Sequence, residues 1–429
     1  MPIIYVHGVN VRSRDGFLAL TDYLRRYLAP VIADDPENVL IDDVFWGDKG
    51  VSFAWGGQSR PRSQLIGMGA GARELQPVEG ALAATAFAAA LDRVPEPQAP
   101  AAPATGGLAA GGPGGAAPPS ARELRLSQLS REDLSDFLTA AIIAADPEPS
   151  PTRTARILAA DAIAMDPATG AALARAKTPA NEVRMAMALL QERAPTEGGL
   201  AGMGGGGFWA DLGDRVSEAT RRALGLPTYA ASVVAAELRK PLNDMVSVFL
   251  GDVMVYLQGR GAVPEPGPIQ RLLLDKLSTA QANAASRNDE PLVVLTHSMG
   301  GQLVWDAVSH FMPRTPALRD VRIDFWCATA SQVGFFEDAK LFIERDPAYK
   351  TGHPVPFPKA QLGHWWNVWD HNDFISFTAK GIVDGVDDEA YSSGMSLISA
   401  HGGYLERPSF FRQFALKLEA ARAKGWSRP

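Results

Sequence analysis

A serine between an apolar run and a helix is the residue of this chain best suited to chemistry. The run Leu292–Leu295 suits one buried strand, and Thr296 and Ser298 follow it within three residues. Residues 302–308 are then typical of a helix with one apolar face. The pattern is G-x-S-x-G with Thr296 in place of the first glycine, and Gly300 keeps side chains out of the space where the turn folds back. Because a strand, a sharp turn and a helix raise a central serine hydroxyl above a sheet edge, we predict that Ser298 is a nucleophile.

A serine hydroxyl needs a base to take its proton, and the base needs a third group to hold it. On a parallel sheet of this kind the chain order is serine, then acid, then histidine. Of the seven histidines, His371 lies inside the loop of candidate acids and five others precede that loop, which leaves His401 as the base. The acid is Asp373 or Asp370. Asp373 is favoured because the chain returns to apolar residues directly after it.

The tetrahedral intermediate of acyl transfer needs two hydrogen-bond donors aimed at its oxygen. The residue after the nucleophile supplies one, the backbone N–H of Met299. The turn after the first predicted strand, at His7 and Gly8, supplies the second, which we assign to the N–H of Val9. His7 braces that turn, and Asn10 either fixes the loop or contributes a side chain to ligand binding.

Short apolar strands alternate with amphipathic helices in two parts of the chain. We predict the strands at residues 2–6, 39–45, 292–295, 321–327, 365–369 and 395–399, and the helices at 15–28, 269–285, 301–311 and 410–424. This alternation predicts an α/β fold: a mostly parallel sheet with helices on both faces.

The segment between the second and third predicted strands differs in composition. Residues 95–120 are almost entirely Pro, Ala and Gly and cannot bury a core, which predicts a disordered stretch. Helical patterns lie on both sides of it. We therefore divide the chain into an α/β core, residues 1–50 and 266–429, and a large helical cap or insertion, residues 51–265. Within the insertion, Asp252 on an apolar helix face either contacts the active-site wall or pairs with an arginine or a backbone amide.

Composition narrows the classes of function. The formal net charge of −7 argues against binding to nucleic acid. The sequence contains no metal-ligand spacing and no phosphate-binding loop, so we expect neither a metal nor a cofactor. The single cysteine, together with the absence of a signal peptide and of a long apolar segment, leads us to expect a cytoplasmic protein. Transient contact with a membrane surface is compatible with this expectation.

Together, Val6-His7-Gly8, the run Thr296–Gly301, Asp373 and His401 resemble the α/β-hydrolase superfamily, on its lipase and esterase side. The resemblance covers residues 1–50 and 266–429. It departs at Thr296 and in the position of the cap, which in that superfamily often follows a later strand. The resemblance implies a serine hydrolase that forms an acyl-enzyme intermediate, and the Ala- and Leu-rich insertion favours a lipid-like ester. A thioesterase and a hydrolase-like interaction module without turnover are the alternatives that the sequence leaves open.

Overall fold

The computed structural model describes residues 2–56, 58, 125–145, 150–176, 179–193, 246–285, 290–393 and 400–427. The chain divides into two units, one formed by Met1–Pro77, Asp146–Leu158 and Thr228–Pro429 and the other by Val78–Ala145 and Ala159–Pro227. The predicted strand at residues 395–399 and the predicted disordered stretch at 95–120 lie outside the described residues.

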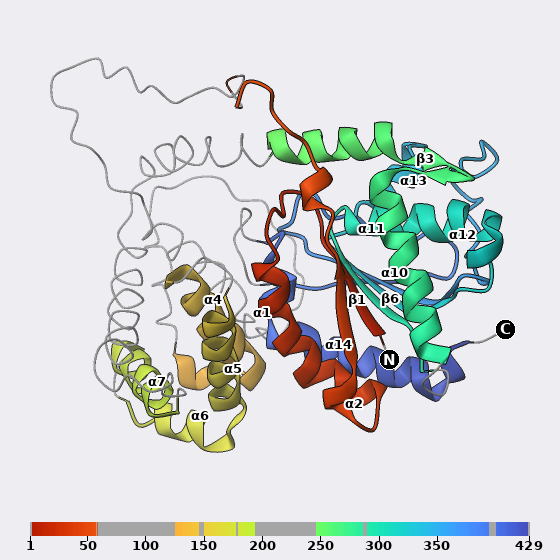
Figure 1. The fold of residues 1–429 in the computed structure, drawn as a ribbon. Helices are drawn as coiled ribbons and strands as arrows, with labels where there is room; N and C mark the ends of the chain where they lie inside the picture. Colours follow the sequence, from red (N-terminus) through yellow and green to blue (C-terminus); the bar gives the residue numbers. More distant parts are fainter. Residues whose placement is uncertain are drawn as a thin grey trace, which may run out of the picture. The chain divides into compact units, whose positions relative to one another are not determined.

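The first unit contains a six-stranded sheet in which every neighbouring pair of strands is parallel (Figure 1). Its order is β2-β1-β5-β6-β7-β8, with β1 at Pro2–Val6, β2 at Leu40–Val44, β5 at Val293–His297, β6 at Ile323–Thr329, β7 at Leu362–Trp369 and β8 at Asp387–Ala390. The expectation of a mostly parallel sheet is therefore confirmed.

Strand β8 was not expected, because three of its four residues are acidic and carboxylates are depleted in strands. Side-chain hydrogen bonds hold it at the sheet edge. Asp388 accepts from Asn367 Nδ2 at 2.8 Å and from Trp369 Nε1 at 2.8 Å, and Glu389 accepts from Trp366 Nε1 at 2.9 Å. Tertiary partners on β7 thus override the low strand propensity of the local sequence.

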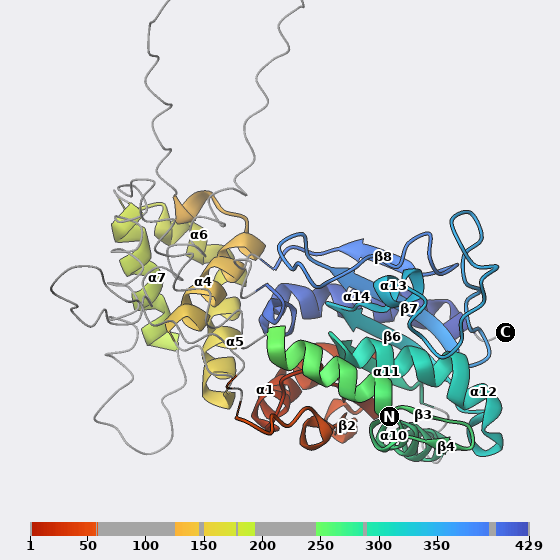
Figure 2. The ribbon, with the colours of Figure 1, turned by 90° about the horizontal axis from the view of Figure 1, so that it is seen from above.

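Helices cover both faces of the sheet, as its alternating side chains require. On one face, Ile4 and Val6 share a core with α10 (Pro268–Ala285) and α11 (Gly300–Asp306). On the other face, Tyr5 stacks on Phe17 of α1 (Asp15–Tyr23), and Phe325 contacts Phe414 of α14 (Pro408–Ala423). Seen from above, α11 and α14 lie on opposite sides of β6 (Figure 2).

The described part of this unit also contains shorter elements. They are α2 (Ala29–Ile32), α12 (Met312–Arg314), α13 (Val333–Asp338) and a two-stranded sheet of β3 (Gly261–Ala262) and β4 (Glu265–Pro266). The sequence also predicts a helix over residues 231–259, of which residues 231–245 lie outside the described residues; its described part, residues 246–259, is helical and contributes Val253 and Tyr256 to the core on the α10 side of the sheet. Tyr256 Oη donates to Asp306 Oδ2 at 2.7 Å, so this helix is tied to α11 by a buried polar contact as well.

The second unit is helical in its described residues. It contains α4 (Arg131–Ala145), α6 (Pro167–Leu173) and α7 (Pro179–Arg193), while α5 (Pro151–Met165) begins in the first unit and ends in the second. Ser130 caps α4 by accepting from the Asp133 amide at 3.0 Å. None of the helices described in the chain combines the length and apolar character that crossing a lipid bilayer requires.

Candidate functional site

Ser298 lies in a strained turn between β5 and α11. Its φ is +52°, in the left-handed region that a residue with a Cβ rarely adopts. The turn is held on one side because the Ser298 amide donates to the Thr329 carbonyl of β6 at 2.9 Å. A strained serine between a parallel strand and a helix has the geometry of a nucleophile elbow, and strain of this kind clusters at functional sites.

Two glycines make the space for this turn. A Cβ on Gly300 would clash with the Val6 carbonyl oxygen, and a Cβ on Gly8 would lie 2.6 Å from the Cβ of Ser298. Both positions therefore require glycine. Thr296 stands at the position of the first glycine in the pattern G-x-S-x-G. It is fully buried, and its hydroxyl accepts a hydrogen bond from Trp326 Nε1 at 2.9 Å.

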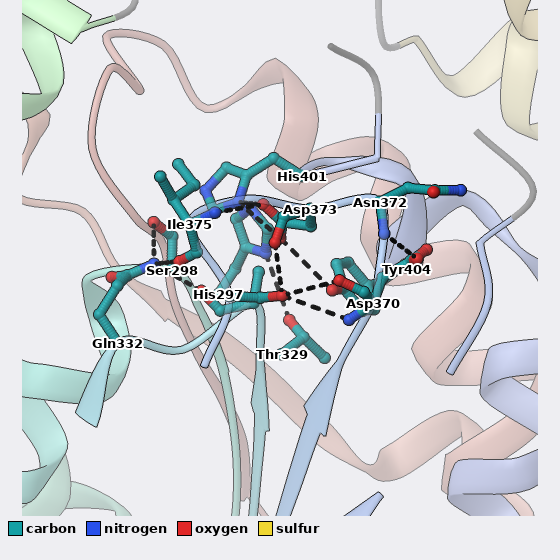
Figure 3. A network of polar contacts seen from close by, with 12 residues as sticks. His297, Ser298, Thr329, Gln332, Asp370, Asn372, Asp373, Ile375, His401 and Tyr404 are labelled. Carbon is teal, nitrogen blue, oxygen red and sulfur yellow. Dashed lines mark hydrogen bonds and ion pairs between the residues drawn. The ribbon is translucent and has the colours of Figure 1, made fainter. Parts of the chain in front are cut away.

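The structure brings His401 and Asp373 together from two separate loops (Figure 3). Nδ1 of His401 lies 3.0 Å and 2.9 Å from the two carboxylate oxygens of Asp373. Asp373 also accepts from the Ile375 amide at 3.2 Å and from Tyr404 Oη at 3.3 Å. The Nε2 atom of His401 is buried and has no hydrogen-bond partner among the described residues. Asp373 therefore orients the imidazole through Nδ1, and Nε2 is left unpaired within the described part of the chain.

Asp370 has a different environment from Asp373. One of its carboxylate oxygens accepts from the Asn372 amide at 2.9 Å, and the other accepts from the Ser393 amide at 2.6 Å. The Asp370 side chain fixes the path of its own loop, and no hydrogen bond joins it to His401 in the described structure.

The Ser298 side chain is covered rather than raised into solvent. Ser298 is only 1% exposed, and Gln332 Nε2 lies 3.5 Å from Ser298 Oγ. The same nitrogen donates to the carbonyls of Ala330 and Ile375, each at 2.6 Å. Ser298 and His401 both belong to the described residues, and no hydrogen bond joins Ser298 Oγ to His401 Nε2.

The two amides predicted as oxyanion donors are not used by the backbone hydrogen bonds of the described residues. Among the described residues, neither the Val9 N–H nor the Met299 N–H makes a hydrogen bond. His7 braces the turn before Val9: its Nδ1–H donates to the Gly8 carbonyl at 2.7 Å, and its Nε2 accepts from the Trp46 amide at 2.9 Å. Burial, as the main cause, lowers the pKa of His7 to about 4, which keeps this imidazole neutral and its two contacts intact.

A buried carboxylate anchors the far end of the same loop. Asn10 has a φ of +62°, and its amide donates to Asp252 at 2.9 Å. Asp252 is fully buried and also accepts hydrogen bonds from both terminal nitrogens of Arg12 and from the amide of Val51. Of the two alternatives for Asp252, the structure shows pairing with an arginine and backbone amides. Asn10 fixes the loop through its backbone.

Two neighbours of the His401–Asp373 pair, His297 and Tyr404, are uncharged. Burial first, and then the neighbouring His401 and His7, lower the pKa of His297 well below its usual value, so this imidazole is uncharged. The ring centroids of His297 and His401 are 4.8 Å apart. Burial and the Asp373 carboxylate raise the pKa of Tyr404, which keeps its hydroxyl protonated as a donor to Asp373.

Sequence reasoning missed three side chains of this network: Gln332, Tyr404 and Arg12. No local pattern distinguishes them, because each acts on a residue that is distant in sequence or in a loop without periodicity. Among the described residues, no group of three His, Cys, Asp or Glu side chains could hold a metal ion. Comparison of the chain with family models, with curated proteins and with solved structures finds no match in any of the three.

Proposed function

We propose that this protein is a serine hydrolase that cleaves a carboxylic ester, with a lipid-like apolar group, through an acyl-enzyme intermediate. The observation that carries the proposal is the His401–Asp373 pair, in which Nδ1 contacts both carboxylate oxygens while Nε2 is left without a partner among the described residues. An imidazole held in this way is suited to take a proton from the Ser298 hydroxyl. The strained turn at Ser298, with its φ of +52°, adds the geometry of a nucleophile.

In this mechanism Ser298 Oγ attacks the ester carbonyl while His401 Nε2 takes the hydroxyl proton. Asp373 holds the Nδ1–H tautomer and stabilises the imidazolium that forms. The amides of Val9 and Met299 donate to the developing oxyanion. His401 then protonates the leaving alkoxide, and a water molecule, activated by the same imidazole, hydrolyses the acyl-enzyme.

A second candidate function has one observation in its favour. Ser298 is 1% exposed and is not hydrogen-bonded to His401, as expected of a hydrolase-like interaction module that has no turnover. The same covering is expected of an enzyme whose active site opens when substrate binds. Covalent labelling separates the two, since only an activated serine reacts with a fluorophosphonate.

The test is labelling and turnover of Ser298→Ala beside Ser309→Ala. We expect the wild type and Ser309→Ala to be labelled at Ser298, because the Ser309 hydroxyl only donates to the Trp305 carbonyl within its helix. Ser298→Ala should be unlabelled, and its ester turnover should fall by a factor on the order of 10⁶. A folded Ser298→Ala protein that keeps more than a few per cent of activity would exclude the proposal, as would a wild type that is never labelled. Oxygen esters and thioesters of the same acyl group distinguish an esterase from a thioesterase.

A further inference from the structure

A cavity of about 230 Å³ is lined by chain neighbours of the candidate site, although Ser298, Asp373 and His401 are not among its lining residues. Three of its lining residues are direct chain neighbours of the site: His297 precedes Ser298, Gly402 follows His401, and His7 precedes the glycine that contacts Ser298. We refer to it as the His297 cavity. Its other walls belong to the same unit of the chain.

The wall of the His297 cavity is mainly apolar. It is formed by side chains of α1, of the loop before α14 and of the first turns of α5, namely Phe17, Leu20, Tyr23, Leu405 and Ile157. The charged groups at the wall are paired with each other. Arg14 is paired with Asp43, and Arg153 is paired with Glu406 at 2.8 Å. No lining cation is therefore left to attract a carboxylate or phosphate, and the cavity suits an uncharged group.

The imidazole of His297 also reaches this wall in its neutral form. Its Nδ1 lies 3.2 Å from the Thr329 hydroxyl, whose own proton is donated to the Thr296 carbonyl at 2.9 Å. Thr329 can thus only accept from His297, so Nδ1 carries a ring proton. Burial also lowers the pKa of His297 well below its usual value, so Nε2 carries none. The side of the cavity nearest to His401 is consequently uncharged as well.

The size of the cavity limits the group that it can hold. An apolar protein cavity of about 150 Å³ holds one benzene molecule, with six non-hydrogen atoms. A volume of 230 Å³ then accommodates, in proportion, roughly nine such atoms. This matches an alkyl chain of medium length and is too small for a whole long-chain fatty acyl group.

We propose that the His297 cavity binds the uncharged alkyl chain of a medium-chain ester, whose carbonyl reacts at Ser298. This inference rests on the proposed function and specifies its substrate class. The chain would pass His401 and His297 and end among Phe17, Leu20 and Ile157. Access to the Ser298 hydroxyl also requires that a covering group move, since the side chain is 1% exposed.

Gly16 is an exposed position at the cavity wall where a longer side chain can be added without disturbing the core. It lines the cavity in the first turn of α1, and a Cβ added there meets no atom within 4 Å. The matched control is Gly170→Leu in α6, where an added Cβ also meets no atom within 4 Å and which does not line the cavity. A third variant, Phe17→Ala, enlarges the cavity instead of filling it.

The experiment measures two quantities on these variants. The first is kcat/KM for p-nitrophenyl acetate, octanoate and palmitate. The second is binding of 1-octanol, by calorimetry, to each variant in the Ser298→Ala background, which needs no turnover. We expect Gly16→Leu to lower kcat/KM for octanoate and the affinity for 1-octanol at least tenfold, with acetate and the Gly170→Leu control unchanged. Phe17→Ala should move the preference toward longer chains.

The outcomes keep the two proposals separate. If the wild type hydrolyses octanoate and Gly16→Leu does so equally well, with equal 1-octanol binding, the cavity assignment is wrong and the proposed function stands. If no ester is hydrolysed but 1-octanol binds and Gly16→Leu alone abolishes the binding, the cavity is an apolar ligand site and the proposed function fails. Absence of 1-octanol binding to the unmodified cavity overturns the assignment in either case.

Discussion

The carboxylate of Asp252 lies outside the proposed set of Ser298, His401 and Asp373, and its replacement should affect both stability and turnover. Asp252 is fully buried and lies in the helix over residues 246–259. Oδ2 accepts from the Asn10 amide at 2.9 Å and from one Arg12 nitrogen at 3.1 Å. Oδ1 accepts from the Val51 amide at 2.6 Å and from the other Arg12 nitrogen at 2.8 Å. One carboxylate thus holds the loop that presents the Val9 amide.

The magnitude for Asp252→Asn follows from this symmetry. An amide group has one acceptor oxygen, so either orientation of Asn loses one backbone amide bond and one guanidinium bond. A buried donor left without a partner costs about 1–3 kcal/mol, and losing the charge weakens the bonds that remain. Arg12 is 39% exposed in its side chain and can be rehydrated, so its loss costs less. We expect the free energy of unfolding to fall by about 2–4 kcal/mol.

Turnover should fall as well, because Asn10 is next to Val9 in the loop. In one orientation of the amide group introduced by Asp252→Asn, the Asn10 N–H loses the acceptor that Asp252 Oδ2 provides. Loss of a whole oxyanion donor costs about 10²–10³ in kcat, so displacement of the loop should cost about tenfold to a hundredfold, with KM little changed. The assay is urea unfolding followed by ester kinetics on the folded protein.

The control for this prediction is Asp42→Asn, the same substitution at a half-exposed ion pair with Lys276. Such surface pairs contribute about 0–1 kcal/mol. If Asp252→Asn is destabilised no more than Asp42→Asn, the buried network does not hold the loop and the reasoning is refuted. A destabilised Asp252→Asn protein with unchanged kcat would instead separate the loop anchor from the oxyanion site.

Two further predictions concern the acid and the pH dependence of stability. Asp373→Asn should lower turnover by about 10⁴, because an amide can hold the wrong tautomer of His401. Asp370→Asn should retain most activity. The measurement is ester kinetics on proteins with matched circular dichroism, and the reverse order of activities would show that the assignment of the acid is wrong. For His7, the pKa in the folded protein is lowered to about 4, mainly by burial. The unfolded chain therefore binds a proton first as pH falls, and stability should decrease between about pH 6.5 and pH 4 by up to about 3 kcal/mol. Urea unfolding of His7→Gln should show a shallower pH dependence in that window than the wild type, and an equal slope would mean that His7 is not the group responsible.

The order of strands and helices was accessible from sequence because it depends on local patterns. The apolar runs before Ser298 and after Pro2 fill buried parallel strands, and the glycines at 8 and 300 are required by contacts within a few ångströms of the turn. Chain order alone selected His401 among seven histidines. Strand β8 escaped prediction because partners on β7 stabilise its acidic side chains, and no local pattern reports them.

The sequence favoured Asp373 over Asp370 as the partner of His401, and only the tertiary structure shows which of the two carboxylates contacts the imidazole. Asp370 and Asp373 are three residues apart in one loop, with similar local propensity, and the path of that loop directs Asp373 to the imidazole and Asp370 to the amides of residues 372 and 393. The same holds for Asp252, which lies about 240 residues from the loop that it anchors. The covering of Ser298 by Gln332 and the volume of the His297 cavity are also set by packing between distant segments. Sequence determines which groups are available, but distances between loops depend on how the whole core packs.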